Sequence, residues 1–146
     1  MSVDIVRRTR SKKLSLAKLK KTARRILDLL DRRESELSLA LVGNREIREL
    51  NARYRHKNEP TDVLSFPSGS APPGGRRILG DVVISIERAE EQARDRGRRL
   101  QDEMEELLIH GILHLLGYDH ERSRREAEVM RRMEKKIRRA LCERGP

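Results

Sequence analysis

Three of the four histidines in this 146-residue sequence lie close together, at positions 110, 114 and 120. His110 and His114 are four residues apart, so on a helix their side chains share one face and can bind one metal ion. Gly117 can adopt the left-handed conformation that ends a helix and reverses the chain, which would bring His120 back to the same point. Three neutral imidazoles leave a tetrahedral metal with one open position for water, as in catalytic sites. The spacing therefore predicts a catalytic metal centre.

Zinc suits three imidazoles best, at one ion per chain, and nickel or another divalent metal is an alternative. A single histidine on an apolar helix is usually a hydrogen-bonded core residue, but three at ligand spacing around a helix-ending glycine are hard to obtain from packing alone. A closed structural site would need a fourth ligand such as Cys142 or Asp81, which the spacing does not demand. Asp119 and Glu121 flank His120, where they can carry protons, orient the ligand or only satisfy a helix dipole.

The histidine spacing equals that of the elongated zinc-peptidase motif H-E-x-x-H-x-x-G-x-x-H, including its glycine. The glutamate of that motif is the general base, and its place is taken here by Gly111. Without a positioned proton carrier, typically worth about 10²–10⁴-fold in rate, peptide hydrolysis by that route is disfavoured. A zinc peptidase-like hydrolase is therefore kept only as an alternative function.

Periodic apolar residues predict the elements that position this site. We expect strands at 3–6, 37–41, 63–66 and 79–84, and helices beginning after Ser15, at Asn44, over 86–96 and 100–116, and after Ser123. Gly97 should end the third helix, and Asn44 should cap the second. Residues 1–146 then form one α+β domain in which Pro67–Arg77, rich in Pro, Gly and Ser, is a mobile loop.

The chain carries a net charge of +10, with a pI near 10.4, and 40% of its residues are charged. Between Val6 and Leu27 there are ten basic residues and no acidic one. This block favours a polyanion, and nucleic acid over membrane because no long apolar stretch is present. The candidate RNA-binding residues on the helix at 15–31 are Lys18, Lys20, Lys21 and Arg24. One cysteine and the lack of a secretory signal indicate a cytoplasmic protein.

Three sequence blocks occur in a fixed order: LNARYRHKNEPTDVLSFP at 50–67, LGDVVI at 79–84 and HGILHLLGYDH at 110–120. In these blocks, and in their spacing over roughly residues 36–141, the sequence closely resembles the YbeY family of bacterial endoribonucleases. The resemblance implies a zincin-like fold, in which a small mixed sheet packs with helices and one zinc site lies at the C-terminal end of a central helix. The zinc ligands would be His110, His114 and His120.

The resemblance also implies a function: single-strand-specific cleavage in 16S rRNA 3′-end maturation and ribosome quality control. The partners would be ribosomal RNA, the small ribosomal subunit and ribosome-associated proteins, with no membrane. The catalytic residues would be Arg55 and His114, and Lys57 would assist at phosphates or lie on the surface. Without the resemblance, Arg55 would be interpreted as a solvated charge at a helix end. A non-catalytic ribosome-assembly protein with a structural zinc is the third hypothesis.

Overall fold

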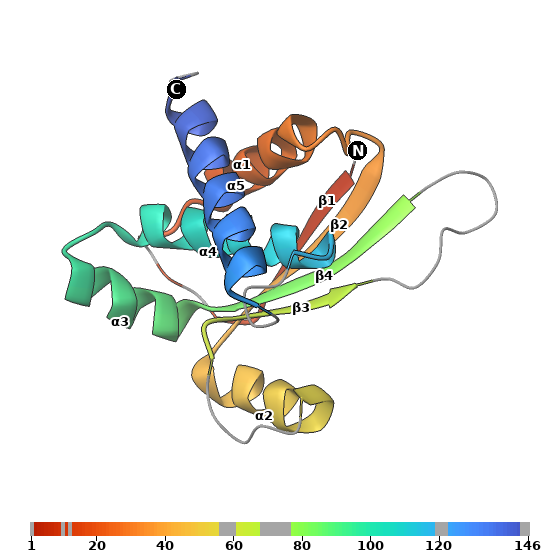
Figure 1. Ribbon diagram of the computed structural model, residues 1–146. Coiled ribbons are helices and arrows are strands. Elements are labelled where there is room, and N and C mark those ends of the chain that lie inside the picture. The colour runs from red at the N-terminus through yellow and green to blue at the C-terminus, as the bar shows by residue number, and fades with distance from the viewer. Residues whose placement is uncertain are drawn as a thin grey trace.

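The computed structural model describes residues 2–9, 11, 13–55, 61–67, 77–118 and 123–143 of the chain. Figure 1 shows the helices of this part arranged around one mixed sheet. The order of the elements is β1 (Ser2–Arg7), α1 (Leu16–Leu29), β2 (Ser35–Val42), α2 (Asn44–Arg55), β3 (Val63–Pro67), β4 (Arg77–Ser85), α3 (Ile86–Arg96), α4 (Leu100–Leu115) and α5 (Arg124–Glu143). The predicted α+β class is confirmed.

The sheet has the strand order β1-β2-β4-β3. β1, β2 and β4 are parallel to one another, and β3 runs antiparallel to β4 at one edge of the sheet. Parallel neighbours need crossover connections, which α1 supplies between β1 and β2, and the segment with α2 and β3 supplies between β2 and β4. As a result, the short edge strand β3 lies beside β4 and next to α4.

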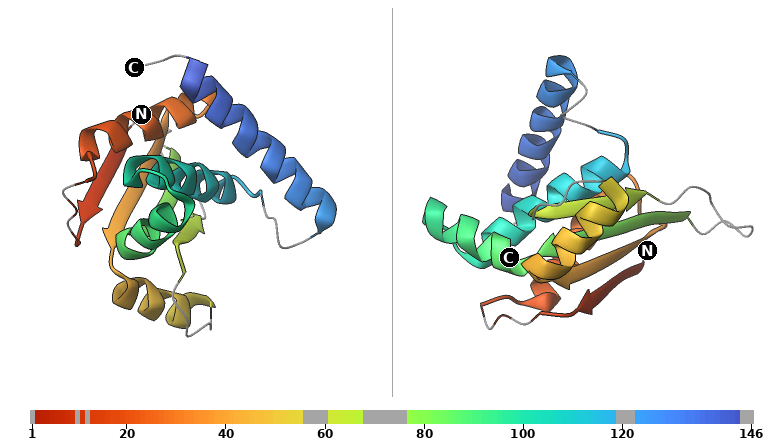
Figure 2. Two further views of the ribbon diagram at one scale, coloured as in Figure 1. Left: turned by 90° about the vertical axis from the view of Figure 1, so that its left-hand side faces the viewer. Right: turned by 90° about the horizontal axis from the view of Figure 1, so that it is seen from below.

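The main core lies between one face of the sheet and the helices α1 and α4 (Figure 2). The alternation of β2 turns Leu37, Leu39 and Leu41 toward this face, where each is at most 1% exposed. A smaller cluster on the opposite face packs under α2 and consists of Val42, Ile47, Leu64 and Val83. The helices α4 and α2 therefore lie on opposite faces of the sheet. None of the described helices has the length and apolar character needed to span a membrane.

The helix ends test the predicted caps. The hydroxyl of Ser15 accepts a bond from the backbone N–H of Lys18 at the start of α1, and Gly97 has a φ of 63° at the end of α3, as predicted. The prediction that Asn44 caps α2 is wrong, because the first helical bond runs from Ile47 N–H to the carbonyl of Gly43. Contacts with another part of the chain replace the expected cap.

Two neighbours occupy the polar groups of Asn44. Its backbone N–H donates to the carboxylate of Glu87 at 2.8 Å, and its side-chain oxygen accepts a bond from the Ser85 hydroxyl at 2.7 Å. Glu87 lies in the first turn of α3, so the start of α2 is held by the start of α3. Such a tertiary contact cannot be predicted from the local sequence.

The predicted loop at 67–77 is too long at both ends. Pro67 is the last residue of β3 and pairs with Gly80, and Arg77 is the first residue of β4. Antiparallel pairing with β4 extends the regular structure to Pro67, and parallel pairing of Arg77 with Ser35 of β2 extends it at the other end of the segment. Residues 68–76 lie outside the described ranges, so the mobility of this segment stays a prediction.

Candidate metal centre

His110 and His114 lie on one face of α4, with ring centroids 5.1 Å apart and ring planes inclined by 52°. Both side chains are half-buried. The residues between and before them, Ile109, Ile112 and Leu113, are fully buried, so packing fixes the rotation of the helix about its axis. The structure therefore presents two neighbouring imidazoles from one rigid element.

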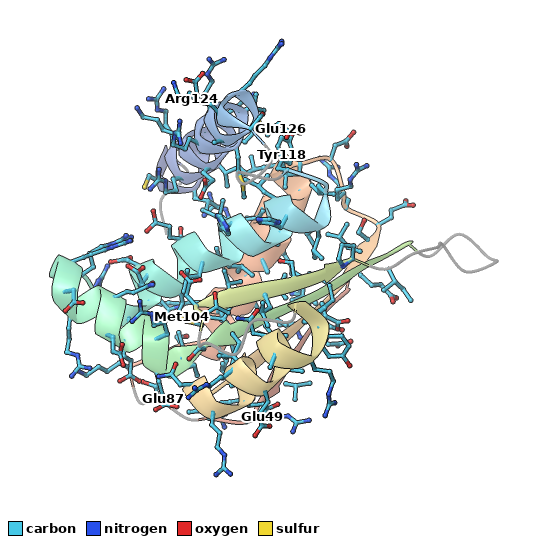
Figure 3. All side chains as sticks on the ribbon, turned by 60° about the horizontal axis from the view of Figure 1, so that its bottom comes forward. Glu49, Glu87, Met104, Tyr118, Arg124 and Glu126 are labelled. Carbon is cyan, nitrogen blue, oxygen red and sulfur yellow. The ribbon has the colours of Figure 1, made fainter. Side chains whose placement is uncertain are left out.

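The turn that ends α4 follows directly after the pair. Gly117 has a φ of 98°, and its N–H donates to the carbonyl of His114 at 3.0 Å, while Tyr118 N–H donates to the carbonyl of Leu113 at 3.1 Å. These two bonds form a Schellman motif, which reverses the chain after a helix. Figure 3 shows Tyr118 where the chain leaves α4. His120 and the flanking residues 119 and 121 lie outside the described ranges, so the convergence of a third imidazole stays a prediction.

Glu134 of α5 is a neighbour of the pair that the sequence interpretation missed. Its Oε2 lies 3.5 Å from Nδ1 of His110, and its side chain is 18% exposed. The signal in the sequence is a carboxylate on the apolar face of α5, four residues after buried Met130 and three before buried Ile137. A carboxylate at Nδ1 favours the imidazole tautomer whose Nε2 can bind a metal.

Gly111 lies where α4 packs closely against the sheet. A Cβ at this position would lie 2.6 Å from Cγ1 of Val82 and 3.3 Å from Cγ2 of Val63. The hydroxyl of Ser65 in β3 also donates to the carbonyl of Gly111 at 2.9 Å. A side chain at 111 would therefore point into the sheet, so a glutamate at this position could not fit there as a general base.

Arg55 is the last residue of α2, on the other face of the sheet from α4. Its neighbour Tyr54 packs against Phe66 of β3 in a T-shaped arrangement, with ring centroids 5.3 Å apart. Gly80 lies against both the backbone of Phe66 and the side chain of Leu115, so α2 and α4 end at the same end of β3. The side chain of Arg55 lies outside the described part of the chain, as do all of residues 56 and 57, including Lys57.

The two alternative fourth ligands lie away from the histidine pair. Asp81 is exposed and alternates with Val82, so its side chain lies on the face of the sheet opposite α4. Cys142 is exposed near the end of α5, eight residues after Glu134 and about 12 Å farther along the helix. Within the described ranges no group of three or more His, Cys, Asp or Glu side chains could hold a metal ion; the third predicted ligand is outside them.

The predicted RNA-binding residues of α1 separate into two pairs. Lys18 and Lys21 line a groove between α1, α3, α4 and α5, and Lys20 and Arg24 are not among the described residues that line it. The groove lies at the N-terminal end of α4, whereas the histidine pair lies toward the C-terminal end. The part of the basic block that lines the groove and the histidine pair therefore belong to different regions of the molecule.

Comparison with known proteins covers nearly the whole chain. The family model described as endoribonuclease YbeY matches residues 4–142. The endoribonuclease YbeY of Aquifex aeolicus is 48% identical over 125 residues, which cover 86% of this chain and 83% of the relative. The one from Persephonella marina is 51% identical over 113 residues, which cover 77% and 74%. A solution structure from Thermotoga maritima, 32% identical, aligns with a TM-score of 0.65 over 92% of this chain and 85% of the other. The chain therefore belongs to the endoribonuclease YbeY family.

Proposed function

We propose that this protein is a metal-dependent endoribonuclease whose single ion, zinc, is held by His110, His114 and His120. The observation that carries this proposal is the pair of adjacent imidazoles on α4, with a carboxylate behind one of them. RNA as the substrate is supported by the name of the relatives, endoribonuclease, and by the net charge of +10.

The residues that surround the pair fit a divalent cation. Neutral imidazoles are common zinc ligands. The ring nitrogen of such a ligand that does not face the metal usually contacts a carboxylate or a carbonyl, and Glu134 supplies this contact to His110. The pair also lies in the last turns of α4, where the helix dipole favours positive charge. Nickel or another divalent ion could take the same nitrogen ligands.

The chain's own residues then have separate tasks in phosphodiester cleavage. When bound, zinc supplies a Lewis acid that polarises a phosphoryl oxygen and lowers the pKa of water to about 7. His110 and His114 fix its position because α4 is packed tightly against the sheet at Gly111. Arg55, a planar and permanently charged fork, binds the phosphate and stabilises the charge that develops on it. Glu134 holds the proton on Nδ1 of His110.

The biological target we propose is ribosomal RNA, in 16S rRNA 3′-end maturation and ribosome quality control in the cytoplasm, together with the small ribosomal subunit. The sequence contains only three aromatic residues, Tyr54, Phe66 and Tyr118, so extended base stacking is not available. Contacts to phosphates then dominate, and the choice of a single-stranded target depends on RNA shape or on protein partners such as ribosome-associated proteins.

Cleavage assays with metal-replete full-length protein test the proposal. We expect cleavage of precursor ribosomal RNA, no cleavage of a peptide library, and one zinc per chain by elemental analysis. His114→Ala should abolish cleavage and lose zinc, and His56→Ala, which removes the fourth histidine, should retain both. RNA binding without cleavage by the zinc-loaded chain would instead favour an assembly protein with a structural zinc, and cleavage of peptides would favour the peptidase alternative.

Two further variants separate the proposed roles. Arg55→Ala should abolish cleavage and leave the zinc content unchanged; loss of zinc would contradict its assignment to the phosphate. Glu134→Gln should weaken zinc binding by about 10–100-fold, the usual effect of removing a partner of a ligand. Zinc affinity is measured by competition with a chelator, and an unchanged affinity would show that Glu134 does not orient His110.

A further inference from the structure

A groove with a volume of about 1070 Å³ lies at the N-terminal end of α4. Its walls are α1, the end of α3 with the turn that follows, the first turns of α4, and the last turns of α5. Leu100 lines the groove and His114 is 14 residues farther along α4, which is about 21 Å at the rise of an α-helix. The groove is therefore separate from the candidate metal centre.

Side-chain bonds between helices hold the walls of the groove in place. The carboxamide of Gln101 in α4 accepts a bond from the backbone N–H of Ser15 at 2.8 Å and donates to the carbonyl of Ser15 at 3.2 Å. The guanidinium of Arg25 in α1 donates to the carbonyl of Leu141 at 3.1 Å, near the end of α5. Since these bonds link three helices, the groove is preformed.

Positive charge predominates in the lining of the groove. Three acidic side chains line it, and one of them, Asp102, is paired with Arg99 at 3.3 Å. The basic residues of the lining are Lys13, Lys18, Lys21, Arg25, Arg94, Arg98 and Arg99. Within the described part of the chain, the charged groups of Lys13, Lys18, Lys21 and Arg94 have no carboxylate at ion-pair distance. They come from two segments far apart in the sequence, which fold together around one concave surface.

We propose that this groove binds the phosphate backbone of the RNA substrate at a distance from the histidine pair, an inference that rests on the proposed endoribonuclease function. Cations without carboxylate partners can neutralise phosphates and release their counterions. The described lining includes no aromatic side chain, so the groove recognises the charge of the backbone and not the identity of the bases.

The separation of groove and histidines sets a minimum length for RNA that reaches both. A stacked strand rises about 3.4 Å per nucleotide, so about six nucleotides span the 21 Å along α4. RNA of about twelve nucleotides can occupy both regions at once, and RNA of four can occupy only one. The groove should therefore lower the KM for longer RNA and leave the KM for short RNA unchanged.

Two double variants test the groove with the same loss of charge. Lys18→Gln/Lys21→Gln removes two cations from the groove, and Lys136→Gln/Arg139→Gln removes two exposed cations of α5 that are not among the described residues lining it. Binding of full-length protein to fluorescent twelve- and four-nucleotide RNA is measured by anisotropy over a range of salt concentrations, together with kcat and KM for cleavage.

For the twelve-nucleotide RNA, the groove variant should bind about tenfold more weakly at 50 mM salt, with a salt slope lower by about 1.4. Its KM should rise while kcat stays the same, and the matched variant should remain close to the native chain. Equal losses in both variants, or an equal rise in KM for the two RNA lengths, would overturn the groove. Tighter binding to poly-glutamate than to RNA would also overturn it and indicate an acidic protein partner. If no RNA is cleaved, the proposed function fails, and the anisotropy comparison still tests the groove.

Discussion

Replacement of Gly111 by alanine sets two effects on the stability of α4 against each other. Alanine is the better helix former, by about 1 kcal/mol in a helix interior. Here, however, its Cβ would lie 2.6 Å from Cγ1 and 3.3 Å from Cγ2 of Val82, and 3.3 Å from Cγ2 of Val63. Val82 is fully buried in the central strand β4, so it cannot move away cheaply. Overpacking of this kind costs about 1–3 kcal/mol and occasionally more.

We therefore expect Gly111→Ala to lower the free energy of unfolding by up to about 2 kcal/mol, against the helix propensity. Unfolding by urea is followed by circular dichroism on metal-free protein, because a bound ion would add its own contribution to the stability. Val82→Ala supplies the control, since it removes the two γ-carbons of Val82 that a methyl group at position 111 would meet. In that background the methyl group introduced at position 111 fills space, and Gly111→Ala should be neutral or stabilising.

The double-mutant cycle gives the coupling between the two positions. A coupling of about 0.5–3 kcal/mol is expected for side chains in direct contact. A native-background Gly111→Ala variant that is more stable by the full helix propensity would refute the close packing of α4 on β4. Additive effects of the two substitutions would refute it as well, because residues that do not touch behave independently.

Three other substitutions test the fold. Gly80→Ala should cost about 3 kcal/mol in a urea titration, because Gly80 has a φ of 142° and a Cβ there would lie 2.4 Å from the carbonyl oxygen of Phe66. Asp31→Gly should raise the stability by about 0.5 kcal/mol, since Asp31 has a φ of 59° at the end of α1. Burial and the nearby charge of Asp102 raise the pKa of Glu105. The protonated form of Glu105 is therefore favoured by folding. The stability that this contributes is complete below the pKa of Glu105 in the unfolded chain, and it is lost as the pH rises through the pKa of Glu105 in the folded chain. Glu105→Gln should thus be more stable than the native chain at pH 7, and the difference should disappear near pH 4.

The sequence predicts well those features that depend on neighbouring residues. The bounds of α3, from Ile86 to Arg96, follow from its apolar period and from Gly97, whose left-handed conformation ends the helix. Ser15 caps α1 because its hydroxyl reaches an N–H only three residues away. The adjacency of His110 and His114 is likewise a property of a single helix, set by its period of 3.6 residues.

Features that depend on contacts between distant segments were missed or misassigned. Asn44 has the right residue type for a cap, yet Glu87 and Ser85 from the start of α3 occupy its polar groups. Glu134 approaches His110 only because α5 packs against α4. The spacing of residues along the sequence does not predict how two helices pack against each other. The side chain of Arg55 and the whole of His120 lie outside the described part of the chain, so the roles of both residues stay predictions.

Several charged contacts hold α4 against its neighbours. Glu103 is 1% exposed and pairs with Arg96 at the end of α3 at 3.2 Å, and Glu106 pairs with Arg138 of α5 at 2.7 Å. One turn farther along the same face of α4, His110 lies opposite Glu134 of α5, one turn before Arg138. The two helices therefore meet along an antiparallel row of charged residues that ends at the histidine pair. Shifting α5 by one turn would separate both contacts at once.

The packing of Gly111 also changes how the missing glutamate is interpreted. From the sequence alone, glycine at this position is interpreted as the loss of the general base of the peptidase motif. In the structure the position faces Val82 and Val63, and its carbonyl is bound by Ser65 of the edge strand. The space that a catalytic glutamate would need is used instead to bring α4 and its histidines against β3. In the proposed mechanism, a metal ion and Arg55 would stabilise the charge that develops on the phosphate. Glycine at this position is therefore compatible with the proposed RNA cleavage, and it permits the close contact between helix and sheet.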